Sequence, residues 1–346
     1  MERHSKKKVI LGIVVAVAVI AAFGVVMHIV ENLLDDEIAD YDITSDEGII
    51  LYLNETEYEV THNIESYLLI GTDDSGNVEA EGTKDYRGPM SDFLLLYVMD
   101  KTANTHGYLQ IDRNTMTDVP FIGPDGNGSG ENYEQICTAS WYGNKPSVGC
   151  TNTVFCVTSL LGELPINGYY SIHMSDIGKL NHAVGGVEIT LEDDFSEADP
   201  EMKKGETLLL NDKQAEIYVR GRMEVGEGTN EERLHRQLDY MEKYKDKVRT
   251  MIGEDPAFIN ELWDSLQSDA VTDISENRVS VMANEMYKGE DLGIFTIDGK
   301  TKVGKTLEDG LEHEEFYADE ASIADALVKL CGIDEDHITP DTGEDE

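Results

Sequence analysis

The chain has 346 residues, of which 27 are Lys or Arg and 70 are Asp or Glu, so its formal net charge at pH 7 is −43. This charge argues against a nucleic-acid partner, because proteins bind nucleic acids by neutralising phosphates with Lys and Arg. Hydrophobic residues make up 40 % of the chain, which is enough for a core, so the composition does not predict global disorder despite the charge.

The first 30 residues predict a membrane anchor. Residues 1–8 form a basic tail and precede an uncharged run over residues 9–30, which at about 1.5 Å per residue gives a helix long enough to span a bilayer. No small-residue cleavage site closes the run, so we expect an uncleaved signal-anchor. The positive-inside rule places residues 1–8 in the cytoplasm and the rest outside the plasma membrane. The alternative is a buried helix of a soluble protein.

Changes in composition divide the rest of the chain into three parts. Residues 31–62 are acidic and end in an alternation of Ile49, Leu51 and Leu53 with polar residues, which predicts a stalk followed by an edge strand. Residues 63–333 show no repeat and no clear linker, so we expect a single extracellular domain. Residues 334–346 are acidic and lack an apolar period, which predicts a disordered tail.

Within the predicted domain, strand and helix patterns alternate. Short apolar runs predict buried strands over residues 67–70, 93–98 and 107–111. Further strands are predicted over residues 187–191 and near residues 316–317. Helical spacing predicts helices over residues 151–161, 175–184, 211–218, 230–251, 255–266, 274–287 and 320–330. The predicted fold class is therefore mixed α/β: a central, mostly buried sheet with helices on both faces, preceded by one N-terminal transmembrane helix.

Arginines are concentrated in one short stretch of this acidic chain. Arg220, Arg222, Arg233 and Arg236 fall within the sequence RGRMEVGEGTNEERLHR. An extended backbone would point the first two guanidinium groups to one side, and Arg233 shares a helix face with Gln237, whereas Arg236 lies partly off that face. The pattern indicates a local anion site; the alternative is that these arginines pair with carboxylates on a solvated surface.

Charged side chains at the ends of predicted strands complete a possible site. Arg113 follows one buried strand, at a sheet end where open α/β sheets bind ligands. Asp73 follows another strand and Asp92 begins the next, so the two carboxylates could share a hard cation. Mg²⁺ takes few carboxylates together with water and phosphate oxygens, and Arg binds phosphate through a planar fork of donors. Together these residues predict a metal–pyrophosphate site.

The order of these motifs resembles the LytR-CpsA-Psr family. The chain reads YLLIGTDDSG, RGPMSDFLLLYVMD, GYLQIDRNTMTDV, TNTVFCVTSLLGELPINGYYSI, HAVGGVEITL and YVRGR followed by ERLHRQ. The family's members are cell-envelope phosphotransferases of mainly Gram-positive bacteria. The resemblance implies that the protein takes a glycopolymer from an undecaprenyl-pyrophosphate carrier and joins it to a peptidoglycan hydroxyl through a phosphodiester.

The resemblance also assigns roles to individual residues. The family's metal-binding aspartates match Asp73 and Asp92, which implies Mg²⁺ as the cofactor. Its pyrophosphate-binding set matches Arg113, Arg220, Arg222, Arg233 and Gln237. We therefore predict Asp92, Arg113, Arg220 and Arg222 as catalytic residues, and Arg87, Arg233, Arg236 and Gln237 as substrate-binding residues.

Some positions depart from the family's pattern. Met90 stands where members usually have Arg, and Arg87, the nearest cation, either substitutes for it or is a surface residue. Asn114 replaces an acid that would help to orient Arg113. These changes put the rate and the polymer specificity in doubt, and leave open an alternative function: a non-catalytic, membrane-anchored binder of polyprenyl-pyrophosphate lipids or wall polymer.

Two cysteines bracket a short loop in the predicted extracellular domain. Cys137 and Cys150 either form a disulfide or are buried free thiols. A disulfide is considered because such bonds persist in extracellular domains.

Overall fold

The computed structural model describes residues 48–76, 81, 86–123, 125–221, 225–226, 228–267, 269–307 and 310–340. The predicted transmembrane run over residues 9–30 and most of the predicted stalk lie outside these residues. None of the helices in the described part is both long and apolar enough to cross a membrane.

A six-stranded mixed sheet forms the centre of the fold. Its strands lie in the order β11 (Val271–Thr272), β8 (Gly168–His173), β3 (Ile64–Thr72), β4 (Ser91–Asp100), β5 (Thr105–Ile111) and β12 (Glu290–Thr296). β4 runs antiparallel to both of its neighbours, whereas β8 is parallel to β3 and β12 is parallel to β5. The ends of β3, β5 and β8 and the start of β4 therefore meet at one edge of the sheet.

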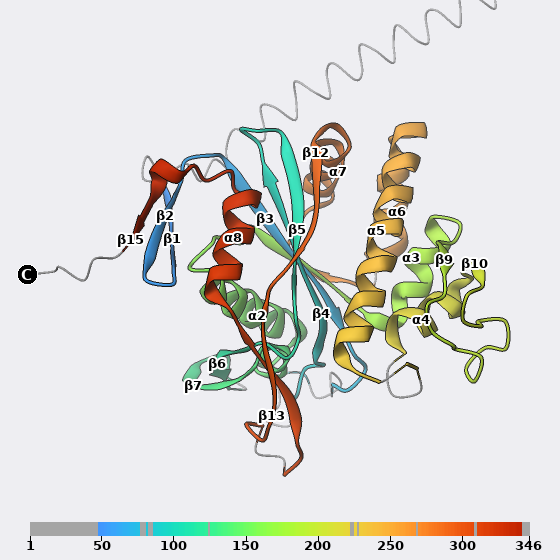
Figure 1. Ribbon diagram of the computed structural model, residues 1–346, viewed down its shortest axis with the longest axis horizontal. Coiled ribbons are helices and arrows are strands. Elements are labelled where there is room, and N and C mark those ends of the chain that lie inside the picture. Colours follow the sequence, from blue (N-terminus) through green and yellow to red (C-terminus); the bar gives the residue numbers. More distant parts are fainter. Residues whose placement is uncertain are drawn as a thin grey trace, which may run out of the picture. The chain divides into compact units, whose positions relative to one another are not determined.

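Both faces of the sheet are buried, because apolar residues occupy successive positions of its central strands. Leu94 and Leu96 pack on one face with α2 (Pro146–Leu160) and α8 (Glu320–Leu330). Leu95 and Tyr97 pack on the other face with residues of α5 (Asn230–Glu254) and α7 (Glu276–Lys288). Figure 1 shows α8 and α5 on opposite sides of the strands. The predicted mixed α/β class, with a buried sheet between helices, is confirmed.

A second layer of elements packs around α5 and shares one hydrophobic cluster with it. It comprises α3 (Ile177–Ala183), α4 (Asp212–Arg220), α6 (Phe258–Leu266) and the hairpin of β9 (Glu188–Thr190) and β10 (Thr207–Leu209). The start of α4 is fixed by a capping box, in which the side chains of Asn211 and Gln214 each accept a hydrogen bond from the other residue's backbone N–H. This cap sets the direction in which α4 carries Arg220.

Three small sheets complete the described part. They are formed by β6 (Met116–Ile122) with β7 (Gly128–Gln135), by β13 (Gly299–Gly304) with β14 (His313–Ala318), and by β1 (Ile49–Leu53), β2 (Thr56–Val60) and β15 (Ile338–Pro340). Short 3-10 helices span Ile136–Trp141, Met174–Asp176 and Glu335–His337.

The predicted disorder of residues 334–346 is wrong for the part that the structure describes. Residues 335–340 form a 3-10 helix and β15, and Ile338 pairs with Tyr58 of β2. Ile338 also packs against the hydrophobic core to which α2 and α8 contribute. Strand pairing with β2 and the contact of His337 Nδ1 with Oε2 of Glu59 at 2.9 Å thus accompany the packing of Ile338 in this acidic segment.

Candidate active site

Three predicted site residues meet at the edge where β3 and β5 end and β4 begins. Asp73 directly follows β3, Asp92 is the second residue of β4, and Arg113 is the second residue after β5. The antiparallel pairing of β4 with both neighbours places these positions side by side.

Asp92 lies in a β-bulge of the pairing between β3 and β4. Gly71 pairs with Phe93, but Thr72 pairs with Ser91, so Asp92 is the extra residue between two partners. Bulges of this kind bend a strand and redirect one side chain, and they are common beside active sites.

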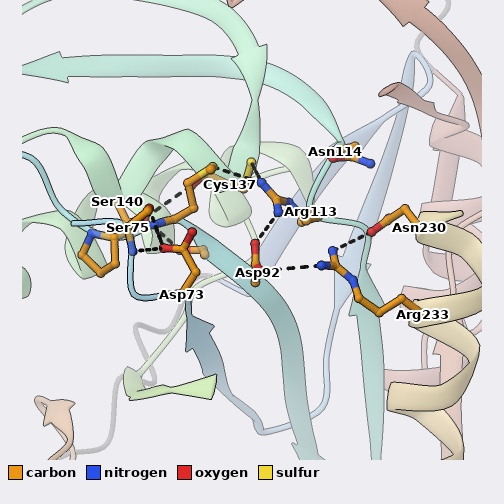
Figure 2. A network of polar contacts seen from close by, with 12 residues as sticks. Asp73, Ser75, Asp92, Arg113, Asn114, Cys137, Ser140, Asn230 and Arg233 are labelled. Atoms are coloured by element: carbon orange, nitrogen blue, oxygen red, sulfur yellow. Dashed lines mark hydrogen bonds and ion pairs between the residues drawn. The ribbon is translucent and has the colours of Figure 1, made fainter. Parts of the chain in front are cut away.

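Asp92 lies between two arginines from different parts of the chain (Figure 2). Its Oδ1 forms an ion pair with Nη1 of Arg113, and its Oδ2 lies 3.6 Å from Nη1 of Arg233. The side chains of Asp92, Arg113 and Arg233 are only 18 %, 14 % and 9 % exposed. Two guanidinium groups thus face one carboxylate at a place where water screens their charge poorly.

Sulfur atoms hold the other side of Arg113. Its Nη2 donates to Sδ of Met90 at 3.0 Å and to Sγ of Cys137 at 3.2 Å, and its Nε has no hydrogen-bond partner among the described residues. Sulfur is a weak acceptor, so Arg113 keeps donor capacity for an incoming anion. Cys137 and Cys150 are both free and buried, which decides against the disulfide. Burial raises the pKa of the Cys137 thiol, so it stays neutral beside the guanidinium.

Arg233 reaches the cluster from the first turn of α5. The Thr229 side chain caps this helix by accepting a hydrogen bond from the backbone N–H of Glu232 at 3.2 Å. Oδ1 of Asn230 accepts a hydrogen bond from Nη2 of Arg233 at 2.7 Å. A helix N-terminus carries unpaired N–H groups and the positive end of the helix dipole, so its position here favours anions further.

Arg220, the last residue of α4, provides a more open cation. Its Nη2 lies 3.2 Å from Oδ2 of Asp74, and its Nη1 donates to Oε1 of Glu216 at 2.7 Å. The side chain is 36 % exposed, so both ion pairs are screened and weak, and a ligand can compete for them. The predicted Arg222 lies outside the described residues.

Arg236 and Gln237 support the end of α4 instead of extending the cluster. Nη1 of Arg236 lies 3.1 Å from Oδ2 of Asp193, and its Nη2 donates to the carbonyl oxygen of Gly221. Nε2 of Gln237 donates to the carbonyl oxygen of Val219 at 3.4 Å. Arg236 is buried and its described contacts are with Asp193 and Gly221, so its role in substrate binding stays a prediction.

Asp73 is oriented by hydrogen bonds to its Oδ1. The backbone N–H and the hydroxyl of Ser75 donate at 3.1 and 2.7 Å, and the backbone N–H of Met90 donates at 2.8 Å. In the described part of the chain no group of three or more His, Cys, Asp or Glu side chains could hold a metal ion. Asp73 and Asp92 nevertheless fit the donor set of Mg²⁺, which takes one or two carboxylates and completes its octahedron with water and phosphate oxygens.

A family model, described as LytR_cpsA_psr, matches the chain over residues 37–324. The chain belongs to the LytR-CpsA-Psr family. This match confirms the resemblance seen in the motifs. No curated protein sequence matches the chain significantly.

Solved structures share the fold of this family member at low sequence identity. Bacillus subtilis TagV is 20 % identical with a TM-score of 0.58, and the match covers 80 % of this chain and 97 % of TagV. TagT bound to LIIa-WTA is 16 % identical with a TM-score of 0.56, covering 78 % of this chain and 90 % of TagT. Lin1025 of Listeria innocua is 23 % identical with a TM-score of 0.53, covering 78 % of this chain and 99 % of that protein.

Met90, one of the departures from the family's pattern, contacts Arg113 directly. Where an arginine is usual, Met90 instead presents a neutral sulfur to the Arg113 guanidinium. Arg87 contacts neither Asp92 nor Arg113 through any described interaction, because its exposed guanidinium stacks 3.5 Å from the ring centroid of Trp141.

Near Asn114, the other departure from the family's pattern, lies an acid that the sequence analysis missed, Asp112. Nδ2 of Asn114 lies 3.5 Å from Oε2 of Glu314, while its backbone N–H donates to Oδ1 of Asp112 at 2.8 Å. Nδ2 of Asn230 also donates to Asp112. The available signal was an Asp directly before the arginine at a strand end, which our sequence analysis did not use.

Proposed function

We propose that this family member transfers a cell wall glycopolymer from an undecaprenyl-pyrophosphate carrier to peptidoglycan, forming a phosphodiester. The observation that carries the proposal is the placement of Arg113 and Arg233 on either side of Asp92 at the sheet edge. Such a pair of partly buried guanidinium groups suits a doubly charged phosphate ligand. The fold shared with TagT, which has been solved bound to LIIa-WTA and to LI-WTA, supports the same substrate class.

In the proposed reaction the oxygen of a peptidoglycan hydroxyl attacks the phosphorus atom that carries the glycopolymer. The bond from that phosphorus to the bridging oxygen breaks, undecaprenyl phosphate leaves, and the hydroxyl loses its proton. Phosphoryl transfer depends mainly on in-line positioning and charge stabilisation. Arg113 and Arg233 would bind the phosphate oxygens, and the more open Arg220 would bind charge on the leaving phosphate.

Magnesium is part of this proposal because Asp73 and Asp92 fit it. When bound, Mg²⁺ would neutralise charge on the pyrophosphate. Asp73 is held ready for that role, since its hydrogen bonds to Ser75 and Met90 fix the carboxylate at the end of β3.

Turnover is the experiment that tests the proposed function. The full chain in detergent should release undecaprenyl phosphate from a pyrophosphate-linked glycolipid only when a peptidoglycan acceptor and Mg²⁺ are present. The alternative, a binder of polyprenyl-pyrophosphate lipids, is favoured by Met90, which leaves the site one cation short of the family's usual set. Tight lipid binding with no release of undecaprenyl phosphate would support this alternative and reject the transferase.

The proposed substrates lie outside the cell membrane, so the site must face outward. A reporter fused after Glu346 should be active only outside the cell, and external protease should leave a fragment of about 30 residues, the length of a cytoplasmic tail plus one spanning helix. Detection of the C-terminal reporter in the cytoplasm would contradict the extracellular placement.

A further inference from the structure

An unassigned contact joins the turn that carries Arg113 to the helix that carries Arg233. Asp112 is the first residue after β5, and Asn230 is the first residue of α5. Nδ2 of Asn230 donates to both carboxylate oxygens of Asp112, at 3.0 and 3.2 Å. The two residues are 118 positions apart, so this contact links two separate parts of the fold.

The chemistry of the two side chains fixes the direction of the Asn230 amide. A carboxylate only accepts hydrogen bonds, so the amide must turn its NH₂ group toward Asp112 and its oxygen away. That oxygen accepts a hydrogen bond from Nη2 of Arg233 at 2.7 Å. The reversed amide would set oxygen against the carboxylate and NH₂ against the guanidinium, and both contacts would be lost.

We propose that Asp112 is a positioning residue: it fixes the amide of Asn230, which holds the guanidinium of Arg233 beside Asp92. Figure 2 shows the later part of this relay, from Asn230 through Arg233 and Asp92 to Arg113. The consequence for transfer rests on the proposed function, since Arg233 must bind the pyrophosphate. The relay itself can be tested by anion binding alone.

Asp112 has a second contact, and the first variant must keep it. Its Oδ1 accepts the backbone N–H of Asn114, which closes the turn before Arg113. Asp112→Asn retains Oδ1, which accepts from Asn114 and at 3.0 Å from Asn230, but it places an NH₂ group where Nδ2 of Asn230 donates at 3.2 Å. Two donors then face each other, so the Asn230 amide is no longer held in one direction. The affinity for inorganic pyrophosphate, measured by calorimetry, should fall about ten-fold, the loss of one charge-assisted contact.

The sign of this change separates the relay from a general charge effect. Asp112→Asn removes one negative charge, which by long-range electrostatics alone would strengthen anion binding. A matched control is Asp194→Asn, because Asp194 is an exposed acid that accepts the backbone N–H of Ser196 at 2.8 Å in a similar turn. This control should leave the pyrophosphate affinity unchanged.

Reversing the pair should restore the relay. In the double variant Asp112→Asn with Asn230→Asp, the amide at position 112 can donate to the carboxylate at position 230, which still accepts from Arg233. Pyrophosphate affinity should return to within about three-fold of the wild type, because the same two contacts are made again. If Asp112→Asn does not fold, Asn230→Ala is expected to show the same ten-fold loss, and unchanged affinity in that variant would overturn the inference.

A double-mutant cycle asks whether Asp112 acts through Arg233. In an Arg233→Ala background, Asp112→Asn should cause no further loss of pyrophosphate affinity. Unchanged or tighter binding by Asp112→Asn alone, or an equal loss in both backgrounds, would overturn the positioning role. If the relay behaves as expected but the wild type never transfers glycopolymer, the proposed function fails while the role of Asp112 stands.

Discussion

Asp92→Ala is expected to abolish glycopolymer transfer and to leave the protein folded. Asp92 pairs with Arg113 and Arg233, and with Asp73 it completes the carboxylate pair proposed for Mg²⁺. Losing the carboxylate would lose the bound ion, whose charge stabilisation of the transition state is worth several kcal/mol. Loss of about 4 kcal/mol from the transition state corresponds to roughly a thousand-fold drop in rate. The release of undecaprenyl phosphate measures the rate, and thermal unfolding measures the fold.

Binding and turnover should respond to this substitution in different ways. Without Mg²⁺, Asp92→Ala should bind inorganic pyrophosphate at least as tightly as the wild type, because the carboxylate no longer competes for the two guanidinium groups. Asp118→Ala, at an exposed acid of β6, is the control and should change neither binding nor rate. Full activity of Asp92→Ala, or of the wild type in excess chelator, would reject a metal-dependent mechanism.

Within the central sheet, the strands that could be predicted are those buried on both sides. β3, β4 and β5 are recognisable because each contains a short cluster of apolar residues, as in Leu94, Leu95 and Leu96 of β4. β8 reads GYYSIH and β12 reads EDLGIFT, and neither has a run of apolar residues or a clear alternation. Their place in the sheet depends on pairing with β3 and β5, which are distant in sequence, so local patterns could not predict it.

Exposed hairpins and helix starts escaped prediction for a related reason. β7 and β13 read GSGENYEQ and GKTKVG, and most of their side chains are exposed, so no hydrophobic period marks them. The prediction for α2 began at residue 151, but the helix begins at Pro146. Its first turn has little apolar spacing, and the usable signal was the proline, which is favoured at the first position of a helix.

Some residues of the candidate site could likewise be predicted from the local sequence, whereas others depend on contacts between distant parts of the chain. Charge type and strand-end position were enough to select Asp92 and Arg113, and spacing within one helix selected Arg233. The contact of Asp112 with Asn230 spans 118 positions and leaves no local pattern. The position of Asp92 between two arginines also depends on a bulge, which only the strand register shows.

Arg113→Ala is expected to weaken binding of a polyprenyl-pyrophosphate lipid about ten- to a hundred-fold, since a charge-assisted contact to a buried phosphate contributes about 1.5–3 kcal/mol. Arg113 is 14 % exposed, and its Nε is buried without a hydrogen-bond partner among the described residues, so water screens the charge of this guanidinium poorly. Arg113→Lys keeps the charge but loses the planar fork, and its affinity should fall between those of the wild type and Arg113→Ala. Equilibrium binding with a labelled lipid measures all three proteins.

Long-range charge is the competing explanation, because any lost cation makes this chain of charge −43 still more repulsive to anions. Lys204→Ala is the control, since Lys204 is an exposed cation on the loop before β10. Exposed charges more than about 8 Å apart are largely screened at physiological salt, whereas close contacts in a cleft persist. At that salt concentration the control should bind as the wild type does, while Arg113→Ala remains weak. Equal losses in the two variants would mean that the arginine cluster is only part of a solvated surface, and the assignment of this edge of the sheet as the active site would be wrong.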